Sequence, residues 1–263
     1  MNNISVIIPL HRYDDDVKKY LNQAVKSVEE QSAKPEKVFI ISSREVNEQV
    51  KKDLGDRVDY ILNKGSLDYC TQINVGAKEC KTKYFSVLAF DDKYNKAWFK
   101  SVNKYIETMP EYSIYLPIVN FVDNDDKMMG FANELIWAMS FSNELGVIDA
   151  DVLEHYYDFS INGGVFRVDD FLEIGGLKPS IKLSFWYEFL LRATKNDIKI
   201  YVIPKSGYFH LVEREGSIMD EYSKTMDEEE RLWWIKLASK ECLYKKDRKK
   251  EYKNIKGRVK NIL

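Results

Sequence analysis

Short apolar runs alternate with amphipathic stretches along the first 110 residues. The run at 4–9 is the one expected of a strand buried on both faces, and the runs at 37–41, 58–62 and 84–90 predict three further strands. Between them, apolar residues recur every three or four positions, which is typical of the buried side of a helix. The best example follows the N-cap candidates Asp14 to Asp16 and consists of Val17, Tyr20, Leu21, Ala24, Val25 and Val28. This alternation predicts a mostly parallel α/β sheet with helices on both faces.

The pattern is looser after Pro110. It predicts strands at 113–122, 158–168 and 198–204, the second broken by Gly163–Gly164 and the third ended by Pro204, and helices at 133–142 and 184–195. A further helix over 228–244 is expected to bury Leu232, Ile235 and Trp234. We therefore expect one domain over 1–220, with halves at 1–110 and 111–220, followed by a helical extension over 221–263.

Composition is that of one globular domain with an appendage. The chain has 263 residues, of which 44% are hydrophobic, and its net charge of −2 provides no general attraction to nucleic acid. No stretch approaches the roughly 18 to 20 apolar residues of a membrane helix. Residues 1–12 lack the basic lead and the long apolar run of a signal peptide.

The cysteines indicate a reduced protein. The chain has three, without metal-binding spacing, and Cys70 and Cys80 share a helical stripe with Ile73 and Ala77. They are therefore expected to be small core residues. We expect a cytoplasmic protein, or one of the host cytoplasm if the chain is viral.

Polar residues follow several of the predicted strands. In an open α/β sheet, ligands bind beyond the carboxyl ends of the strands, where this chain has Ser42–Ser43, Asn63–Gly65 and the acidic pair Asp91–Asp92. Adjacent carboxylates repel each other, and a hard divalent cation relieves that repulsion. The alternative is that Asp91–Asp92 caps the helix that begins near Asn95.

Three segments together resemble inverting GT-A glycosyltransferases of family 2. They are "ISVIIPLHRYDDDVKKYLNQAVKSVEEQS", "NVGAKECKTKYFSVLAFDDKYNKAWF" and "INGGVFRVDDFLEIGGLKPSIKLSFWYEFLLRATKNDIKIYVIPKSGYFH". The resemblance covers about residues 3–218 and rests on the order and spacing of the segments. It implies a Rossmann-like GT-A fold, a nucleotide-diphosphate sugar donor, a divalent metal (Mn²⁺ or Mg²⁺) and a glycan or protein acceptor.

The resemblance also implies roles for individual residues. Asp91 and His210 would bind the metal, with Asp92 a second ligand or a sugar contact. Arg214 and Ser217 lie on a loop that would fold over the diphosphate. The acceptor side would include Gly163, Gly164 and Trp186, and the nucleotide would contact Pro9, Leu10, His11, Arg12, Ser42, Ser43 and Asn63. Structural alternatives stay open: turn residues for the serines, a solvated turn around Arg214 and a structural role for His210.

Glu188 is the candidate catalytic base. An inverting transfer needs a carboxylate that takes the proton from the acceptor hydroxyl. Glu188 lies in an apolar stretch, where a carboxylate is costly without a partner or a role. The alternatives are a surface residue or an ion pair with Arg192, four positions on. If Glu188 is not the base, Asp149 or Asp151 is the next candidate.

Several departures from the family pattern leave other functions open. Ser42 or Ser43 stands where the family often has Asp, Ala89 replaces the first acid of the metal motif, and Phe185–Trp186 replaces a Glu-Asp pair. A catalytically weak nucleotide-sugar-binding protein is therefore one alternative. A nucleotidyltransferase is another, although the loop after the first strand lacks glycine; a dehydrogenase is disfavoured because GxGxxG is absent.

Aromatic and basic residues near the C-terminus raise the question of membrane contact. Trp233–Trp234 precede a tail over 245–263 that is rich in lysine and arginine. A basic helix beside exposed aromatic residues can lie on an anionic bilayer, so weak peripheral contact is one interpretation. The other is that the tryptophans pack on the domain and the lysines are solvated.

Overall fold

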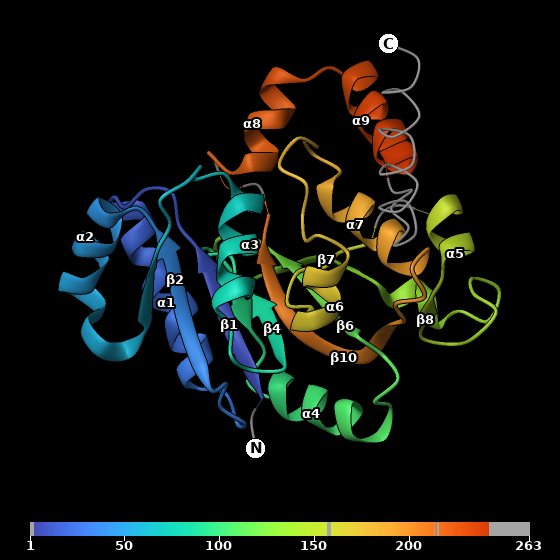
Figure 1. Ribbon diagram of the computed structural model, residues 1–263, viewed down its shortest axis with the longest axis horizontal. Coiled ribbons are helices and arrows are strands. Elements are labelled where there is room, and N and C mark those ends of the chain that lie inside the picture. The colour runs from blue at the N-terminus through green and yellow to red at the C-terminus, as the bar shows by residue number, and fades with distance from the viewer. Residues whose placement is uncertain (1–2, 157–158, 213, 215, 242–263) are drawn as a thin grey trace, which may run out of the picture.

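The computed structural model describes residues 3–156, 159–212, 214 and 216–241, which form one curled mixed sheet with helices on both faces (Figure 1). The strand order is β3-β2-β1-β4-β9-β6-β10-β5, with β7 beside β6 and β8 beside β10. The strands are β1 (Ile4–Pro9), β2 (Lys37–Ser42), β3 (Asp59–Leu62), β4 (Tyr84–Val87), β5 (Lys93–Tyr94), β6 (Ile114–Val122), β7 (Met128–Ala132), β8 (Val147–Ile148), β9 (Val165–Arg167) and β10 (Ile200–Leu211).

The helices divide between the two faces of the sheet. Val6 and Ile8 of β1 belong to the core beneath α1, α2 and α4, whereas Ile7 belongs to the core beneath α3, α5, α6 and α7, because successive side chains of a strand alternate. The helices are α1 (Asp15–Glu29), α2 (Arg44–Leu54), α3 (Tyr69–Glu79), α4 (Trp98–Thr108), α5 (Ala150–His155), α6 (Val168–Glu173), α7 (Phe185–Thr194), α8 (Ile218–Thr225) and α9 (Glu228–Glu241).

Parallel pairing in the first half of the chain creates the ligand-binding edge. β1 pairs in parallel with β2 and β4, and β2 with β3, so the carboxyl ends of these strands meet at one edge. The second half is mixed, because β9 runs antiparallel to β4 and β6 while β10 runs parallel to β6. The expected α/β architecture is confirmed, with more antiparallel pairing than the sequence predicted.

The apolar patterns of the first half predicted its helices and parallel strands correctly but missed the two-residue strand β5, and most of the errors lie in the second half. The helix expected over 133–142 is a short 3₁₀ turn, η2 (Glu134–Trp137), and the strand expected over 158–168 is reduced to β9. β10 continues through Pro204 to Leu211, with irregular pairing to β6 between Val202 and Tyr208. Proline is tolerated there because an irregular strand needs no ladder hydrogen bond from that position.

The C-terminal helices are attached to the main sheet domain. α8 begins at Ile218, so the boundary expected at 220 falls inside a helix. α9 packs along α7, and the Ser184 hydroxyl donates to the Trp234 carbonyl at 2.8 Å. Figure 1 shows α8 and α9 together at the end of the molecule opposite the N-terminus.

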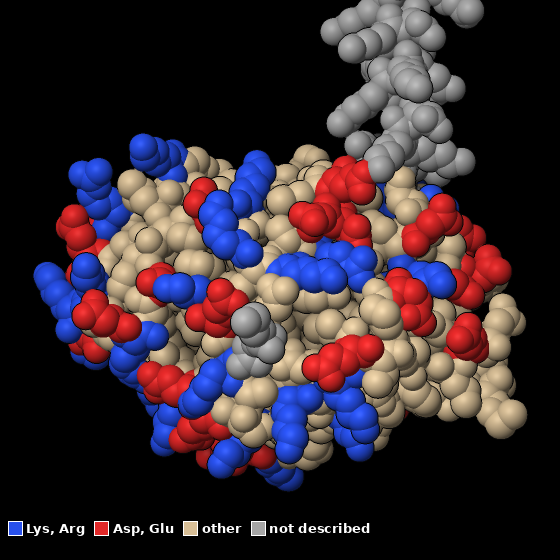
Figure 2. All heavy atoms as spheres, turned by 60° about the horizontal axis from the view of Figure 1, so that its bottom comes forward, with Lys and Arg blue, Asp and Glu red and all other residues tan. Residues whose placement is uncertain are grey.

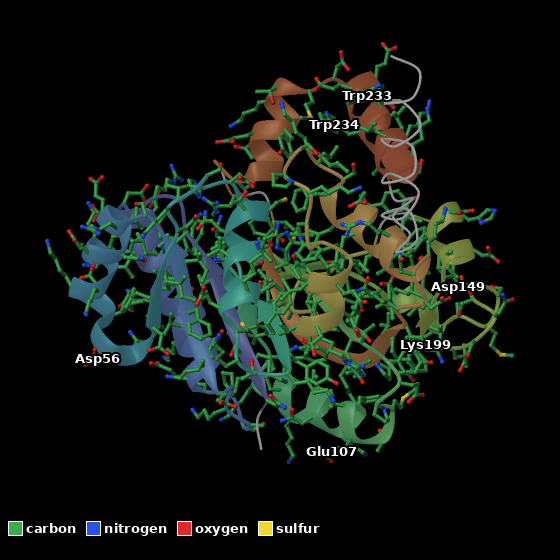
Figure 3. All side chains as sticks on the ribbon, viewed as in Figure 1. Asp56, Glu107, Asp149, Lys199, Trp233 and Trp234 are labelled. Carbon is green, nitrogen blue, oxygen red and sulfur yellow. The ribbon has the colours of Figure 1, made fainter. Side chains whose placement is uncertain are left out.

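The candidates for membrane contact lie on α9 and beyond it. Trp233 is 53% exposed and its ring lies edge-on to Trp234, and Figure 3 shows both at the outer end of the molecule. Leu232, expected to be buried, is exposed. The basic tail over 245–263 lies outside the described residues, so peripheral membrane contact stays a prediction. Within the described ranges, no helix is both long and apolar enough to cross a bilayer.

Charge is evenly mixed over the face seen in Figure 2. Lysine and arginine side chains alternate there with acidic ones, without a continuous area of either sign.

In the core, Cys70 and Cys80 are buried free thiols, as expected. Burial raises the pKa of each thiol to about 12, so both stay protonated near neutral pH.

Close packing of α3 on β1 gives a test of the fold. A Cβ on Gly76 would lie 2.8 Å from Ile7 Cγ2 and 3.2 Å from Ile41 Cγ1. Gly76→Val should therefore lower the free energy of unfolding by about 1–3 kcal/mol through overpacking, measured by urea denaturation. Lys78→Val, on the exposed side of the same helix, is the control and should cost less than about 1 kcal/mol. Equal effects would mean that Gly76 does not limit this packing.

Candidate active site

The carboxylate of Asp92 connects the segment after β4 to the end of β10. Asp92 is 1% exposed, and its Oδ1 accepts a hydrogen bond from the Leu211 N–H at 2.8 Å. Its two oxygens lie 3.1 and 3.0 Å from Nδ1 of His210. Because an ionised carboxylate can only accept, Nδ1 carries a proton, and Nε2 has a free lone pair when the ring is neutral. Asp92 therefore orients His210, which differs from its expected role as metal ligand or sugar contact.

Asp91 is paired with Arg214. The Nε of Arg214 lies 2.5 Å from Asp91 Oδ2, and its guanidinium lies over the Phe90 ring, 4.9 Å from the centroid. Burial raises the pKa of Asp91 and the charge of Asp92 adds to the rise, while Arg214 acts in the opposite direction without cancelling it. The structure thus brings together Asp91 and Arg214, which are 123 residues apart in the sequence.

His210 is held in an acidic environment. Burial lowers the pKa of His210, but the carboxylates of Asp92 and Asp91 outweigh burial and hold the pKa above its usual value. The Phe121 ring packs edge-on against the imidazole at 5.9 Å. The ring is therefore fixed from two sides, by an aromatic contact and by a carboxylate.

Asp91, already paired with Arg214, and His210 are the candidate ligands for a divalent cation. The Asp91 carboxylate and Nε2 of His210 are of the types that Mn²⁺ and Mg²⁺ accept, and Asp92 would orient the imidazole, as carboxylates often do for metal-bound histidines. In the described part of the chain, no group of three or more His, Cys, Asp or Glu side chains is arranged to hold a metal. Oxygens of a substrate and water would therefore have to complete the coordination.

Two side chains of the β1–α1 loop, His11 and Arg12, lie near the loop that carries Arg214. Burial lowers the pKa of His11, and the charges of Arg12 and Arg214 add to the effect. Arg12 is 46% exposed and lies 3.5 Å from Asp14. A Cβ on Gly216 would lie 3.6 Å from Arg12 Nη2, so the loop before α8 contacts the loop after β1. Both loops therefore present cations beside Asp91.

Other residues expected to bind the nucleotide shape the edge of the sheet instead. Ser42 is fully buried and donates to the Leu10 carbonyl at 2.5 Å, while the Ser43 hydroxyl caps α2. Asn63 is 5% exposed and bonds within its own turn, to Ser66 and Gly65. Pro9 and Leu10 are buried as well. The two serines therefore end a strand and cap a helix, where the alternative to nucleotide binding expected turn residues, and the side chains of Ser42 and Leu10 are not available to a ligand.

Ser217 and the glycine pair also have structural roles. The Ser217 hydroxyl caps α8 by accepting from the Asp220 N–H at 3.0 Å. Trp98 Nε1 donates to the Gly163 carbonyl at 2.8 Å, and a Cβ on Gly163 would lie 2.6 Å from the Tyr208 ring. Gly164 is equally enclosed, since its Cβ would lie 2.8 Å from the Ile161 carbonyl oxygen. The two glycines, expected on the acceptor side, thus serve close packing beneath the site.

Tyr69 and Trp186 contact each other near the acidic pair. Trp186 is half-buried and stacks on Phe166, with centroids 5.3 Å apart. Tyr69 lies 5.6 Å from the Phe185 ring. Burial raises the pKa of the Tyr69 hydroxyl, a hydrogen bond with Trp186 acts in the opposite direction, and the charges of the acidic pair reach it. Tyr69 has no distinct signal in the sequence because, four positions before Ile73, it looks like one more residue of the apolar face of α3.

Gln72 is a second residue that sequence reasoning missed. It is 1% exposed; its Oε1 accepts from the Leu10 N–H at 2.9 Å and its Nε2 donates to the Leu67 carbonyl at 2.6 Å. It therefore holds together the loops that follow β1 and β3. The sequence gives one signal of this role, which is that Gln72 is a polar residue between the apolar positions Cys70 and Ile73 of a helix.

Comparison with known proteins identifies the family. The model of the family "Glycosyl transferase family 2" matches residues 5–160. The chain is a member of glycosyl transferase family 2. No curated protein matches the sequence.

Solved structures of glycosyltransferases share the fold. S. aureus TarS 1–349 in complex with UDP-GlcNAc has a TM-score of 0.64 at 16% identity, over 90% of this chain and 66% of that one. The complex of the same fragment with UDP has a TM-score of 0.58 at 15% identity, over 88% and 69%. The longer TarS structure has a TM-score of 0.54 at 15% identity over 84% of this chain, which spans 38% of it. The GT-A fold of this family-2 chain is thereby confirmed.

Glu188 does not have the surroundings of a general base. Its side chain has no exposed surface, and both carboxylate oxygens accept from Arg192, at 2.8 and 2.9 Å. Lys178 Nζ lies 2.9 Å from Oε1. Arg192 also donates to the carbonyls of Ile174 and Gly176. The ion-pair interpretation of this family-2 helix is correct, and the geometry argues against Glu188 as base.

The reserve candidates for the base lie on α5. Asp149 caps this helix, since its Oδ1 accepts from the Val152 N–H at 2.8 Å, and Asp151 lies in the first turn. Figure 3 shows Asp149 at the margin of the molecule. A capping carboxylate at that margin gives no support to a role in catalysis.

The buried ion pair generates a prediction. Glu188→Gln leaves Arg192 buried without its counter-charge, so the free energy of unfolding should fall by about 3–5 kcal/mol in urea denaturation. The control is Glu154→Gln, which breaks the exposed pair with Lys195 (2.8 Å) and should cost about 0–1 kcal/mol. If Glu188→Gln were as stable as wild type but inactive, the base assignment would have to be restored.

Proposed function

We propose that this family-2 chain transfers a sugar from a nucleotide-diphosphate sugar to a hydroxyl group of a glycan or protein, with inversion at the anomeric carbon. The observation that carries the proposal is the cluster of Asp91, Asp92 and His210 beside Arg12 and Arg214, at the carboxyl edge of parallel strands. Acids and cations arranged in this way suit a metal and a diphosphate.

The donor side of the cluster has a defined chemistry. Asp91 and His210 would hold Mn²⁺ or Mg²⁺, which would stabilise negative charge on the departing diphosphate. Arg12 and Arg214 would donate hydrogen bonds to its oxygens, because a guanidinium recognises phosphate through paired N–H groups. His11, whose pKa is lowered by burial, would serve there as a neutral hydrogen-bonding group. The TarS structures with UDP and UDP-GlcNAc make these compounds the first to test.

A second candidate function follows from the way in which the three candidate carboxylates are already paired. Asp92 is bonded to His210 and Leu211, Asp91 is paired with Arg214, and Glu188 is paired with Arg192. None of these three is placed to take a proton from an acceptor. This favours, as the alternative, a nucleotide-sugar-binding protein with slow turnover, in which Trp186 stands where the family often has an acid.

Metal-dependent binding tests the donor site. When manganese is present and UDP is at about a hundred times its Kd, the free energy of unfolding of the wild-type chain should rise by about 2.7 kcal/mol, seen as a thermal shift. Asp91→Asn should lose the manganese-dependent part and keep the fold of the apo protein. Asp59→Asn, which removes a half-exposed partner of Lys37 at the start of β3, is the control and should shift like wild type. An unchanged shift in Asp91→Asn would remove Asp91 from the site.

Turnover separates the two candidate functions. UDP-GlcNAc and manganese are incubated with the chain, and release of UDP is followed with water alone and with glycan acceptors. Acceptor-stimulated release supports a transferase. Binding of UDP-GlcNAc without release above the uncatalysed rate would establish the binding protein instead.

A further inference from the structure

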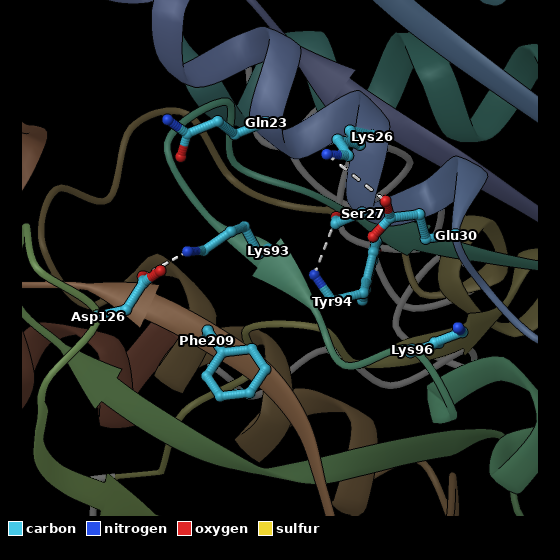
Figure 4. Close-up of a pocket in the computed structure, with 9 residues that line it drawn as sticks. All are labelled: Gln23, Lys26, Ser27, Glu30, Lys93, Tyr94, Lys96, Asp126 and Phe209. Atoms are coloured by element: carbon cyan, nitrogen blue, oxygen red, sulfur yellow. Dashed lines mark hydrogen bonds and ion pairs between the residues drawn. The ribbon is translucent and has the colours of Figure 1, made fainter.

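A second concave site lies between α1 and the edge strand β5. Its volume is about 420 Å³, within the range of small-molecule sites, which is about 300–1,000 Å³. Figure 4 shows side chains of α1 on one side and those of β5, β10 and the β6–β7 turn on the other. We name it the α1–β5 groove; its lining includes Lys26, Glu30, Lys93, Lys96, Asp126 and Phe209.

The walls of the α1–β5 groove are fixed by buried hydrogen bonds. The Ser27 hydroxyl accepts from the Tyr94 N–H at 3.1 Å and donates to the Ala24 carbonyl at 2.7 Å. Gln31, 3% exposed, donates to the Asn95 carbonyl at 2.8 Å. These contacts tie β5 to α1 independently of any ligand. The groove is therefore preformed, and binding would require little ordering of its walls.

The groove carries an excess of positive charge. Lys93 is paired with Asp126 across it, and Lys26 lies 3.7 Å from Glu30 (Figure 4). Lys96 is exposed, and no acidic side chain of the described residues forms an ion pair with it. The two ion pairs are neutral overall, and the ammonium group of Lys96 leaves one positive charge. Such a groove would suit a ligand with several neutral polar groups and one negative charge.

Phe209 and the paired charges favour a sugar as the neutral part. The half-buried Phe209 ring can cover the apolar C–H face of a pyranose, while hydroxyl groups both donate and accept hydrogen bonds. The carboxylates of Glu30 and Asp126 offer acceptors, and Gln23 and the lysines offer donors. A purely apolar ligand would leave these groups desolvated without partners.

The α1–β5 groove is separate from the donor site. Phe209 lines it, and the next residue of β10 is His210 of the acidic cluster. Consecutive side chains of a strand point to opposite faces, so β10 itself separates the two sites. A nucleotide bound at the cluster would leave the groove open.

We propose that the α1–β5 groove binds an anionic carbohydrate, with the Phe209 ring against the sugar and Lys96 on its phosphate or carboxylate. This site goes beyond the proposed transfer reaction and does not depend on it. A chain with no transferase activity could still bind such a ligand there.

Binding of glucose 6-phosphate to the full chain tests the proposal, observed by saturation-transfer NMR on the sugar protons. Glucose and inorganic phosphate are the comparison ligands. Binding of inorganic phosphate is measured by how well it displaces glucose 6-phosphate. Each should bind at least about tenfold more weakly than glucose 6-phosphate, because each lacks one of the two recognised parts. Saturating UDP with manganese should leave the affinity unchanged, which separates this site from the donor site.

Variants assign the binding to the groove. Lys96→Gln removes one charge-assisted hydrogen bond and should weaken glucose 6-phosphate about tenfold. Phe209→Leu should weaken it while keeping an apolar side chain. Lys100→Gln, an exposed position of α4 outside the groove lining, is the matched control and should bind like wild type.

Four results would overturn the proposal: no binding of glucose 6-phosphate, equal binding of glucose, displacement by UDP, or equal affinity of Lys96→Gln and Lys100→Gln. None of them bears on the metal-dependent binding of UDP, so this proposal and the proposed transfer can fail separately.

Discussion

The buried carboxylate of Asp92 determines the geometry of the site. Its two partners, His210 and the Leu211 N–H, lie at the end of β10, 118 and 119 residues further along the chain. A desolvated carboxylate is stable there because it accepts hydrogen bonds from both. The same contacts fix the imidazole relative to Asp91 and bring the cations of the neighbouring loops to one edge. The candidate active site therefore depends on an interaction between the two halves of the chain.

Apolar substitution on the acceptor side has a structural basis. Trp186 is part of an aromatic cluster with Phe166 and Phe189, and Phe185 packs on Tyr69. A carboxylate at position 186 would lie among these rings and would be desolvated without a partner. The missing acid at position 186 thus coincides with well-packed aromatic surroundings.

How much the sequence revealed depended on the length of each pattern. β1 and α1 were predicted correctly because a continuous apolar run and a six-residue stripe leave one interpretation. By contrast, β5 and β8 have two residues each, too few for a period to be recognised, and α8 is a helix of eight mostly polar residues without a clear apolar stripe.

In the candidate site, the position of Asp91–Asp92 directly after a strand marked them as candidates. The side chains that pair with each of these acids could not be recognised from the sequence. Spacing alone could not show that Arg192 would be buried with Glu188, since an (i, i+4) pair on a helix is usually a surface feature. Gln72 and Tyr69 depend on contacts between loops that no local pattern contains.

The irregular middle of β10 constrains how this chain can vary in length. β10 pairs regularly with β6 up to Val202 and again from Tyr208, so the intervening residues set which face the end of the strand presents. Side chains alternate along a regular strand, so a residue gained or lost there would exchange the faces of Phe209 and His210 unless the irregular segment absorbed it. The surface turns of this fold can lengthen freely, whereas a change of length between Val202 and Tyr208 has to be taken up within that segment if both side chains are to keep their faces.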